Sequence, residues 1–143
     1  EHLASYFAQY AQEFFHGTPV ECHVSLPDCL PNVGLSSQIR HHLFLAVHEA
    51  LTNILKHSGA TRAELHLHCH PQFLECRVRD NGRGFDPTAP RPPTDPAQGL
   101  RNLHHRMADV GGECRITSAR GQGTEVCLRL PWPDPNRIPT PNP

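Results

Sequence analysis

The chain has 143 residues, a formal net charge of −1 at pH 7 and 37% hydrophobic residues. This length suits one domain, and area scaling predicts that about two thirds of the unfolded surface is buried on folding, which is enough for a core without a stabilising metal or disulfide. The near-neutral charge argues against a general nucleic-acid binder, no apolar run reaches the length of a membrane span, and no signal peptide is evident.

Hydrophobic periodicity predicts the secondary structure in chain order. Apolar residues recur at helical spacing over 1–15, and an alternating stretch over 21–26 predicts a short strand. A second helix is expected from a serine cap near residue 36 to about His57, with Gly59 ending it. The remaining predicted elements are a strand hairpin over 62–70 and 72–80, an irregular proline-rich loop over 85–98, a helix over 99–110, and a second hairpin over 113–119 and 123–131.

This order predicts the fold class. Strands grouped in hairpins and separated by helices indicate an α+β sandwich, in which helices cover one face of a mixed sheet. We expect residues 1–131 to form this domain. Residues 132–143 are rich in proline and polar residues and are expected to be a disordered tail.

The cysteines and histidines do not predict a metal site. Five of the six cysteines lie in apolar alternating stretches, where a free thiol behaves as a small hydrophobic group, so we expect a reduced, cytosolic domain. On a strand, His66, His68 and His70 would share one face, most simply an exposed polar face above a buried apolar one. A zinc module is the alternative, but the ligand spacing of structural zinc sites is missing.

The long helix carries a polar stripe opposite much of its apolar one. Glu49, Asn53, Lys56 and His57 fall at i, i+4, i+7 and i+8 and so share a face of an α-helix. A solvated surface would explain this stripe. A site for magnesium and phosphate would explain it as well, because Mg²⁺ prefers oxygen ligands together with substrate phosphates, and Lys56 is the chain's only lysine.

Three glycine-containing segments are candidate ligand loops. Asp80-Asn81-Gly82-Arg83-Gly84 directly follows a strand; it is either a hairpin turn or a place where the backbone approaches a ligand and Asp80 accepts a hydrogen bond from an exocyclic amine. Gly99-Leu100 opens a helix, as a hinge or as a phosphate contact, and Gly121 to Thr124 is a hairpin turn or part of the same site.

Taken together, these segments resemble a known superfamily. His48-Glu-Ala-Leu-Thr-Asn53, the segments at 80–85 and 121–126, and Gly-Leu-Arg-Asn-Leu-His-His-Arg at 99–106 resemble the N box and glycine boxes of the GHKL ATPases. The chain looks like the catalytic, ATP-binding domain of a bacterial sensor histidine kinase, most similar to the nitrate/nitrite-sensor-like subgroup. One departure is Asn102, which stands where this superfamily often has a second glycine.

The resemblance implies the Bergerat fold, ATP with Mg²⁺ as cofactors, and a role for each matched residue. Asn53 would bind magnesium, and Glu49 would be the catalytic acid that assists phosphoryl transfer or orients the metal shell. Lys56 and His57 would contact phosphates, and Asp80 would bind the adenine amine. The other nucleotide-binding residues implied are Gly82, Gly84, Phe85, Gly99, Leu100, Gly123 and Thr124, with residues 86–98 as a mobile lid.

The resemblance also implies partners. Because the chain begins with Glu rather than Met, we expect a fragment whose phosphoacceptor histidine lies in a dimerisation domain before residue 1. The full protein would be a cytoplasmic or membrane-anchored homodimer acting on a response regulator, and this fragment a monomer that does not bind nucleic acid. The alternatives are an anti-sigma-factor serine kinase or ATP-driven switch of the same superfamily, and a degenerate module that no longer binds ATP.

Overall fold

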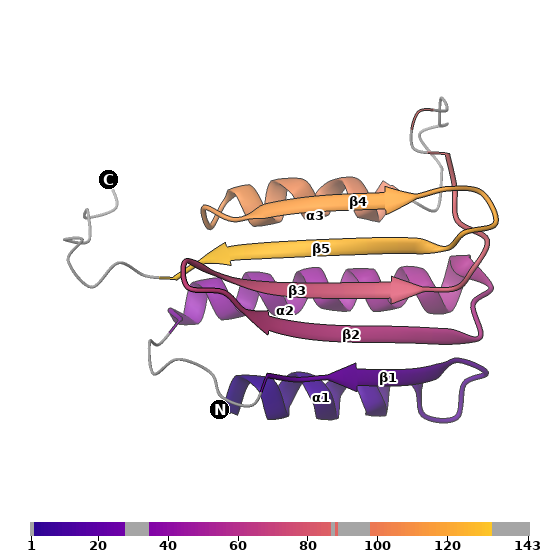
Figure 1. The fold of residues 1–143 in the computed structure, drawn as a ribbon, viewed down its shortest axis with the longest axis horizontal. Helices are drawn as coiled ribbons and strands as arrows, with labels where there is room; N and C mark the ends of the chain where they lie inside the picture. The colour runs from indigo at the N-terminus through magenta and orange to yellow at the C-terminus, as the bar shows by residue number, and fades with distance from the viewer. Residues whose placement is uncertain (1, 28–34, 87, 89–97, 133–143) are drawn as a thin grey trace.

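The structure is a computed structural model that describes residues 2–27, 35–86, 88 and 98–132. Its five strands form one mixed sheet in the order β1-β2-β3-β5-β4 (Figure 1). β1 pairs with β2 in parallel, and the other neighbours are antiparallel. The strands are β1 (Glu21–Ser25), β2 (Arg62–Cys69), β3 (Phe73–Asp80), β4 (Glu113–Ser118) and β5 (Thr124–Pro131).

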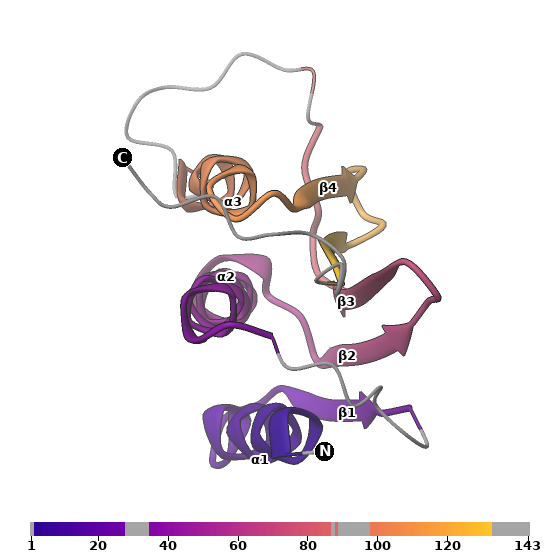
Figure 2. The same ribbon diagram turned by 90° about the vertical axis from the view of Figure 1, so that its left-hand side faces the viewer.

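All helices of the described part lie on one face of this sheet (Figure 2). They are α1 (His2–Phe15), α2 (Ser37–Asn53), the π-helical turn η1 (Ile54–Ser58) and α3 (Gln98–Ala108). α2 begins as predicted, because the Ser36 hydroxyl accepts a hydrogen bond from the Ile39 amide at 3.2 Å. The predicted α+β sandwich, with helices covering one face of a mixed sheet, is therefore confirmed.

The core lies between the helices and the sheet. Phe7 of α1, Leu43 of α2 and Met107 of α3 are fully buried against strand residues such as Leu65 and Leu128. Their spacing follows the helical and strand periods, so burial of one stripe or one face per element holds the two layers together. No helix of the described part is long and apolar enough to cross a membrane.

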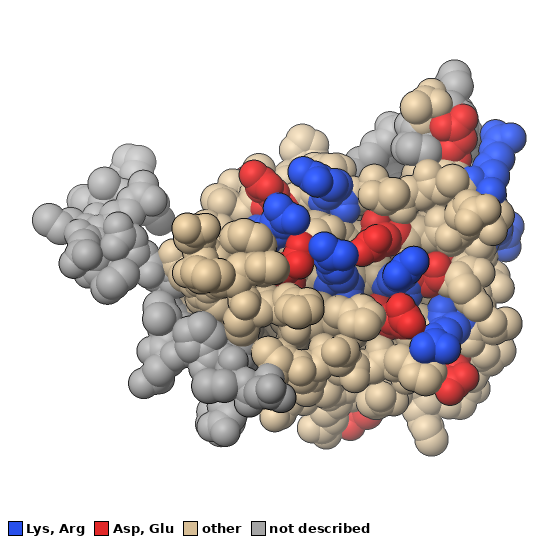
Figure 3. All heavy atoms as spheres, viewed as in Figure 1, with Lys and Arg blue, Asp and Glu red and all other residues tan. Residues whose placement is uncertain are grey.

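The opposite face of the sheet carries interleaved arginine and glutamate side chains (Figure 3). As predicted, Leu65 and Leu67 of β2 are buried, while the side chains of His66 in β2 and of His70 just after it are 37% and 39% exposed. Among the described residues, no group of three or more histidine, cysteine or acidic side chains could hold a metal, and none of the five cysteines that the structure describes forms a disulfide.

Glu75 is an exception to the exposure of this face, because the residue is only 2% exposed. Its Oε1 accepts hydrogen bonds from Arg77 at 3.3 Å and from Arg129 and Cys127 at 3.2 Å, and its Oε2 lies 3.1 Å from a ring nitrogen of His70. Burial alone would raise the pKa of Glu75, but these neighbours lower it to about 2. Glu75 is thus a buried, ionised group that ties β3 to β5.

The end of the long helix differs from the prediction. An α-helix was expected to about His57, but α2 ends at Asn53 and continues as η1, whose hydrogen bonds span five residues instead of four. Gly59, at φ +67°, ends it as expected. The α-helical spacing that placed Lys56 and His57 on the face of Glu49 therefore does not hold beyond Asn53, and π-helical turns of this kind are frequent at functional sites.

Candidate functional site

Several predicted site segments meet at one end of the sheet. The carboxyl ends of α2 and β3, the β4–β5 turn and the start of α3 all lie at the right-hand end in Figure 1. Asp80, the last residue of β3, pairs directly with Thr124, the first residue of β5. Segments that are more than 40 residues apart in the sequence therefore adjoin each other through the β3–β5 pairing.

The turns after β3 and before β5 interlock, and glycine is required where they touch. A β-carbon on Gly84, at φ +62°, would lie 2.1 Å from the Ala119 carbonyl oxygen, and one on Gly123, at φ +78°, would lie 2.1 Å from the Asp80 carbonyl oxygen. The Gly121 amide donates to the Arg83 carbonyl at 2.6 Å. Only glycine combines a left-handed backbone with such a close approach, so Gly84 and Gly123 shape the site by lacking side chains.

The Asp80 carboxylate is buried within these turns. The residue is 7% exposed, and its Oδ1 accepts a hydrogen bond from the Gly82 amide at 2.8 Å. Burial raises the pKa of Asp80, and the backbone amides of Gly82 and Thr124 oppose that shift. An ionised carboxylate has about four acceptor positions, so this group keeps acceptor capacity for a ligand.

Two hydroxyl groups follow Asp80 across the sheet, because Thr124 pairs with Asp80 and Ser118 pairs with Thr124. Thr124 is buried, and its Oγ1 lies 2.9 Å from the Oγ of Ser118 at the end of β4. Ser118 Oγ also accepts from the Phe85 amide at 2.9 Å and donates to the Gly123 carbonyl at 3.1 Å. Ser118 therefore joins both turns to the residue that pairs with Asp80.

The end of the long helix is joined to the same turns. The Ser58 carbonyl accepts from the Arg83 amide at 2.8 Å, and a β-carbon on Gly82 would lie 2.4 Å from that carbonyl oxygen. Ser58 is buried, and its hydroxyl donates to the Ile54 carbonyl at 2.6 Å within η1. The Asn81 side chain fixes the other side, accepting from the amides of Thr61 and Arg62 at 3.0 Å.

The predicted polar stripe of α2 contributes the remaining side chains at this end. Glu49 and Asn53 are half-buried, whereas Lys56 and His57 are exposed on η1. None of the four side chains has a hydrogen bond or ion pair to another residue that the structure describes, so their polar groups are available to a ligand. The Asn53 amide oxygen and the Glu49 carboxylate are the kind of oxygen ligand that Mg²⁺ prefers.

Other predicted residues are only partly covered by the description. Gly99 and Leu100 lie in the first turn of α3, but their surroundings fall outside the described residues. So does most of the predicted lid over 86–98. At its start, the backbone amide of Thr88 donates to Asp86 Oδ1 at 2.9 Å, and its hydroxyl donates to the same oxygen at 2.6 Å.

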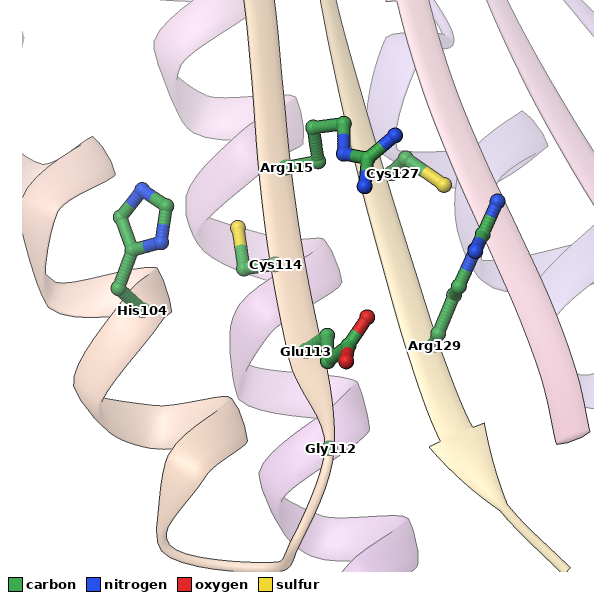
Figure 4. Close-up of a pocket in the computed structure, with 7 residues that line it drawn as sticks. All are labelled: His104, Gly112, Glu113, Cys114, Arg115, Cys127 and Arg129. Atoms are coloured by element: carbon green, nitrogen blue, oxygen red, sulfur yellow. The ribbon is translucent and has the colours of Figure 1, made fainter.

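A separate hollow of about 360 Å³ lies beside the edge strand β4, between His104 of α3 and Arg129 of β5 (Figure 4). Cys114 points toward α3, whereas Arg115 lies on the other side of the strand. The side chains that line the hollow therefore lie on both sides of the edge strand β4.

Sequence reasoning did not select three residues that build this site: Ser58, Asn81 and Ser118. In the sequence, Asn81 is recognisable only as part of a turn signal. Its hydrogen bonds from the amides of Thr61 and Arg62 depend on the register between β2 and β3. Ser118 could have been found from its position opposite Thr124 in the predicted second hairpin. Ser58 could have been found as the small polar residue immediately before the glycine that ends the helix.

Comparison with known proteins identifies the family. Residues 38–134 match the family described as "Histidine kinase-, DNA gyrase B-, and HSP90-like ATPase". The chain belongs to this ATPase family. The matched region covers α2 from its second residue, η1 and both interlocked turns, so the candidate site lies within the matched residues.

Similar members of this ATPase family are sensor proteins. The chain is 29% identical over 119 residues to sensor histidine kinase LiaS of Bacillus subtilis, covering 83% of this chain and 31% of that protein. It is 31% identical over 93 residues to sensor protein VraS of Staphylococcus saprophyticus, covering 65% of this chain and 26% of that protein. The chain thus spans about a third or less of the length of these curated relatives.

Solved structures agree with this assignment at the level of the fold. The histidine kinase domain of the Erythrobacter litoralis EL346 blue-light activated histidine kinase matches with a TM-score of 0.72 at 23% identity, covering 91% of this chain and 61% of that chain. Full-length ShkA in complex with AMPPNP matches with a TM-score of 0.71 at 20% identity, covering 91% and 29%. The predicted superfamily is confirmed; the narrower nitrate/nitrite-sensor-like subgroup is not, because these curated relatives are LiaS and VraS.

Proposed function

We propose that this chain is the ATP-binding catalytic domain of a two-component sensor histidine kinase. It transfers the γ-phosphoryl group of ATP to a histidine in a dimerisation domain that is not part of this sequence. The observation that carries the proposal is the buried Asp80 carboxylate, held by the Gly82 amide where the two glycine turns interlock, within the region that matches the ATPase family.

Asp80 recognises the adenine base. Its carboxylate accepts a hydrogen bond from the exocyclic amine, and Gly82 and Gly84 let the backbone pass close to the base. Phe85, Gly123 and Thr124 complete the base-binding end of the site. An amine in this position is recognised strongly, because a base that presents a carbonyl oxygen instead would leave a buried acceptor facing another acceptor.

The phosphates lie toward the end of the long helix and the start of α3. Lys56 and His57 neutralise phosphate oxygens, and Gly99 and Leu100 contact the phosphates through the helix start. Asn53 holds Mg²⁺, and Glu49 orients its coordination shell or assists the transfer; the metal neutralises charge on the phosphates. Catalysis then consists of positioning the γ-phosphoryl group in line with the incoming imidazole rather than of covalent chemistry by this domain.

The same proposal gives the full-length protein its partners, oligomeric state and location. Its partners are its own phosphoacceptor domain and a response regulator, it acts as a homodimer, and this fragment is a monomer. Residues 1–131 form the catalytic domain, with 132–143 as a tail. The domain works in the cytoplasm, and the sequence of residues 48–60 favours a kinase of the nitrate/nitrite-sensor-like subgroup. The sensor kinases among its relatives favour this reading over an anti-sigma-factor kinase.

The proposal is tested by comparing the ATP affinity of the variant Asp80→Asn with that of the parent chain. The amide oxygen can still accept from the Gly82 amide, but the variant loses the negative charge and presents an N–H₂ group to the adenine amine. A hydrogen bond to a charged group contributes about 1.5–3 kcal/mol, so we expect ATP affinity to fall by about 10- to 100-fold in titration calorimetry with magnesium.

The fold should survive this change. Because burial raises the pKa of Asp80, ionisation of this carboxyl at pH 7 disfavours the folded state, and a neutral amide avoids that cost. Asp109→Asn is the matched control, since it makes the same substitution on an exposed residue immediately after α3. Unchanged ATP affinity in Asp80→Asn would refute the adenine-binding role, and a parent chain that binds no ATP would refute the proposed function.

A further inference from the structure

Ser118 uses every hydrogen-bonding position of its hydroxyl group. A hydroxyl has one proton to donate and two lone pairs that accept. The Gly123 carbonyl can only accept, so Ser118 donates to it, and the Phe85 amide can only donate, so Ser118 accepts from it. One lone pair is left for Thr124, whose Oγ1 lies 2.9 Å away.

This arrangement fixes the direction of the bond between the two hydroxyls. Since the Ser118 proton is already engaged, Thr124 must donate its own proton to Ser118. The Thr124 oxygen then has only lone pairs left, and no other side-chain hydrogen bond joins it to a described residue. Thr124 is therefore an acceptor only, although a threonine hydroxyl can ordinarily also donate.

Thr124 and Asp80 are direct cross-strand partners, so their side chains lie on the same face of the sheet. Both are buried, at 7% exposed each. With the Thr124 proton engaged by Ser118, this end of the site presents two acceptors, one from each strand. Such a pair suits an amino group with two N–H donors and repels a carbonyl oxygen.

We propose that Ser118 is a positioning residue that sets base specificity: by engaging the Thr124 proton, it makes the site accept a 6-aminopurine nucleotide and reject a 6-oxopurine one. This inference rests on the proposed ATP-binding function and adds a residue and a selectivity mechanism to it. Without Ser118, the Thr124 hydroxyl can rotate and donate to a 6-oxo group, so discrimination falls even where the site stays intact.

The test compares ATP with inosine triphosphate, which carries an oxygen in place of the 6-amino group. Dissociation constants for both are measured with magnesium for the parent, Ser118→Ala, Ser118→Thr, Thr124→Val and the Ser118→Ala/Thr124→Val pair. Orienting one neutral hydrogen bond changes binding by about three- to tenfold, so Ser118→Ala should lower the ATP preference by about that factor. Ser118→Thr, which keeps a hydroxyl, should restore it.

Two further readouts separate positioning from simple structural support. The double variant should discriminate no worse than Thr124→Val alone, because Ser118 acts through that hydroxyl. Amide exchange of Phe85 should be faster in Ser118→Ala but not in Thr124→Val, since Phe85 bonds only the serine oxygen of this pair. Should Ser118→Ala not fold, Ser118→Cys takes its place, because a thiol is a weak donor and acceptor.

If Ser118→Ala leaves the ratio of the two dissociation constants unchanged, even with both nucleotides bound more weakly, the inference is overturned and the proposed function stays intact. A parent chain that binds neither nucleotide would overturn the proposed function, and the inference with it.

Discussion

Gly121 and Gly123 have almost the same backbone conformation, with φ of +77° and +78°, but different surroundings. A β-carbon on Gly121 would have nothing within 4 Å, whereas one on Gly123 would lie 2.1 Å from the Asp80 carbonyl oxygen. Alanine at each position therefore separates the cost of a left-handed backbone from the cost of the close approach between the two turns.

The left-handed conformation costs a non-glycine residue about 1–2 kcal/mol, which is the loss of unfolding free energy expected for Gly121→Ala. Gly123→Ala has the same cost and must also relieve the overlap. An ordinary carbon–oxygen contact is about 3.5 Å, so the turns must part by roughly 1.4 Å from the 2.1 Å contact. Comparable overpacking costs about 1–3 kcal/mol, so we expect a total of about 2–5 kcal/mol for Gly123→Ala.

Urea unfolding followed by circular dichroism measures both losses. ATP titration adds a second readout, because the displaced oxygen belongs to Asp80, so Gly123→Ala should also weaken nucleotide binding while Gly121→Ala leaves it near the parent value. The two alanines costing the same within about 0.5 kcal/mol would refute the close packing of the turns, since the backbone cost alone is shared.

Three other predictions concern the open sheet face, the metal and the chemistry. The ionised form of Glu75 stabilises the fold above its ordinary pKa of 4.5, and this contribution is lost as the pH falls toward about 2. The urea stability of Glu75→Gln should therefore fall less between pH 5 and pH 2.5 than that of the parent, and a parallel fall in both would contradict the ionised buried carboxylate; the exposed Glu113→Gln serves as the control. Asn53→Ala should remove much of the magnesium dependence of ATP binding in calorimetry yet leave adenosine binding nearly unchanged, and an unaltered magnesium dependence would make Asn53 an ordinary surface residue. Finally, the 143-residue chain should stay unlabelled with radioactive ATP and magnesium, because no described histidine lies on a helix free to reach the γ-phosphate in line at about 3–3.5 Å. Acid-labile phosphate at one per chain would overturn that expectation, whereas a version joined to the proposed phosphoacceptor domain should become labelled.

Local regularities in the sequence were sufficient for much of the fold. The helical stripe that buries Leu43 and the alternation that buries Leu65 while exposing His66 depend only on the periods of a helix and a strand, which any short window contains. The glycine turns after β3 and before β5 were likewise visible, because glycine is the residue that tolerates a left-handed backbone. The motif order was then enough to identify the superfamily.

The tertiary structure decided which of these local pieces touch. The β3–β5 pairing places Thr124 opposite Asp80 and interlocks the two turns, and this pairing joins residues too far apart for any sequence window to contain. The same holds for Ser118, whose three hydrogen bonds reach across both turns, and for Glu75, which alternation places on the open face but which its charged neighbours bury. The π-helical end of α2 is also a tertiary outcome, since the Ser58 carbonyl there is held by the Arg83 amide. Periodicity specifies which face of an element is apolar, but pairing and close backbone contacts are set by the packing of the whole domain, so the geometry of the site emerged only in three dimensions.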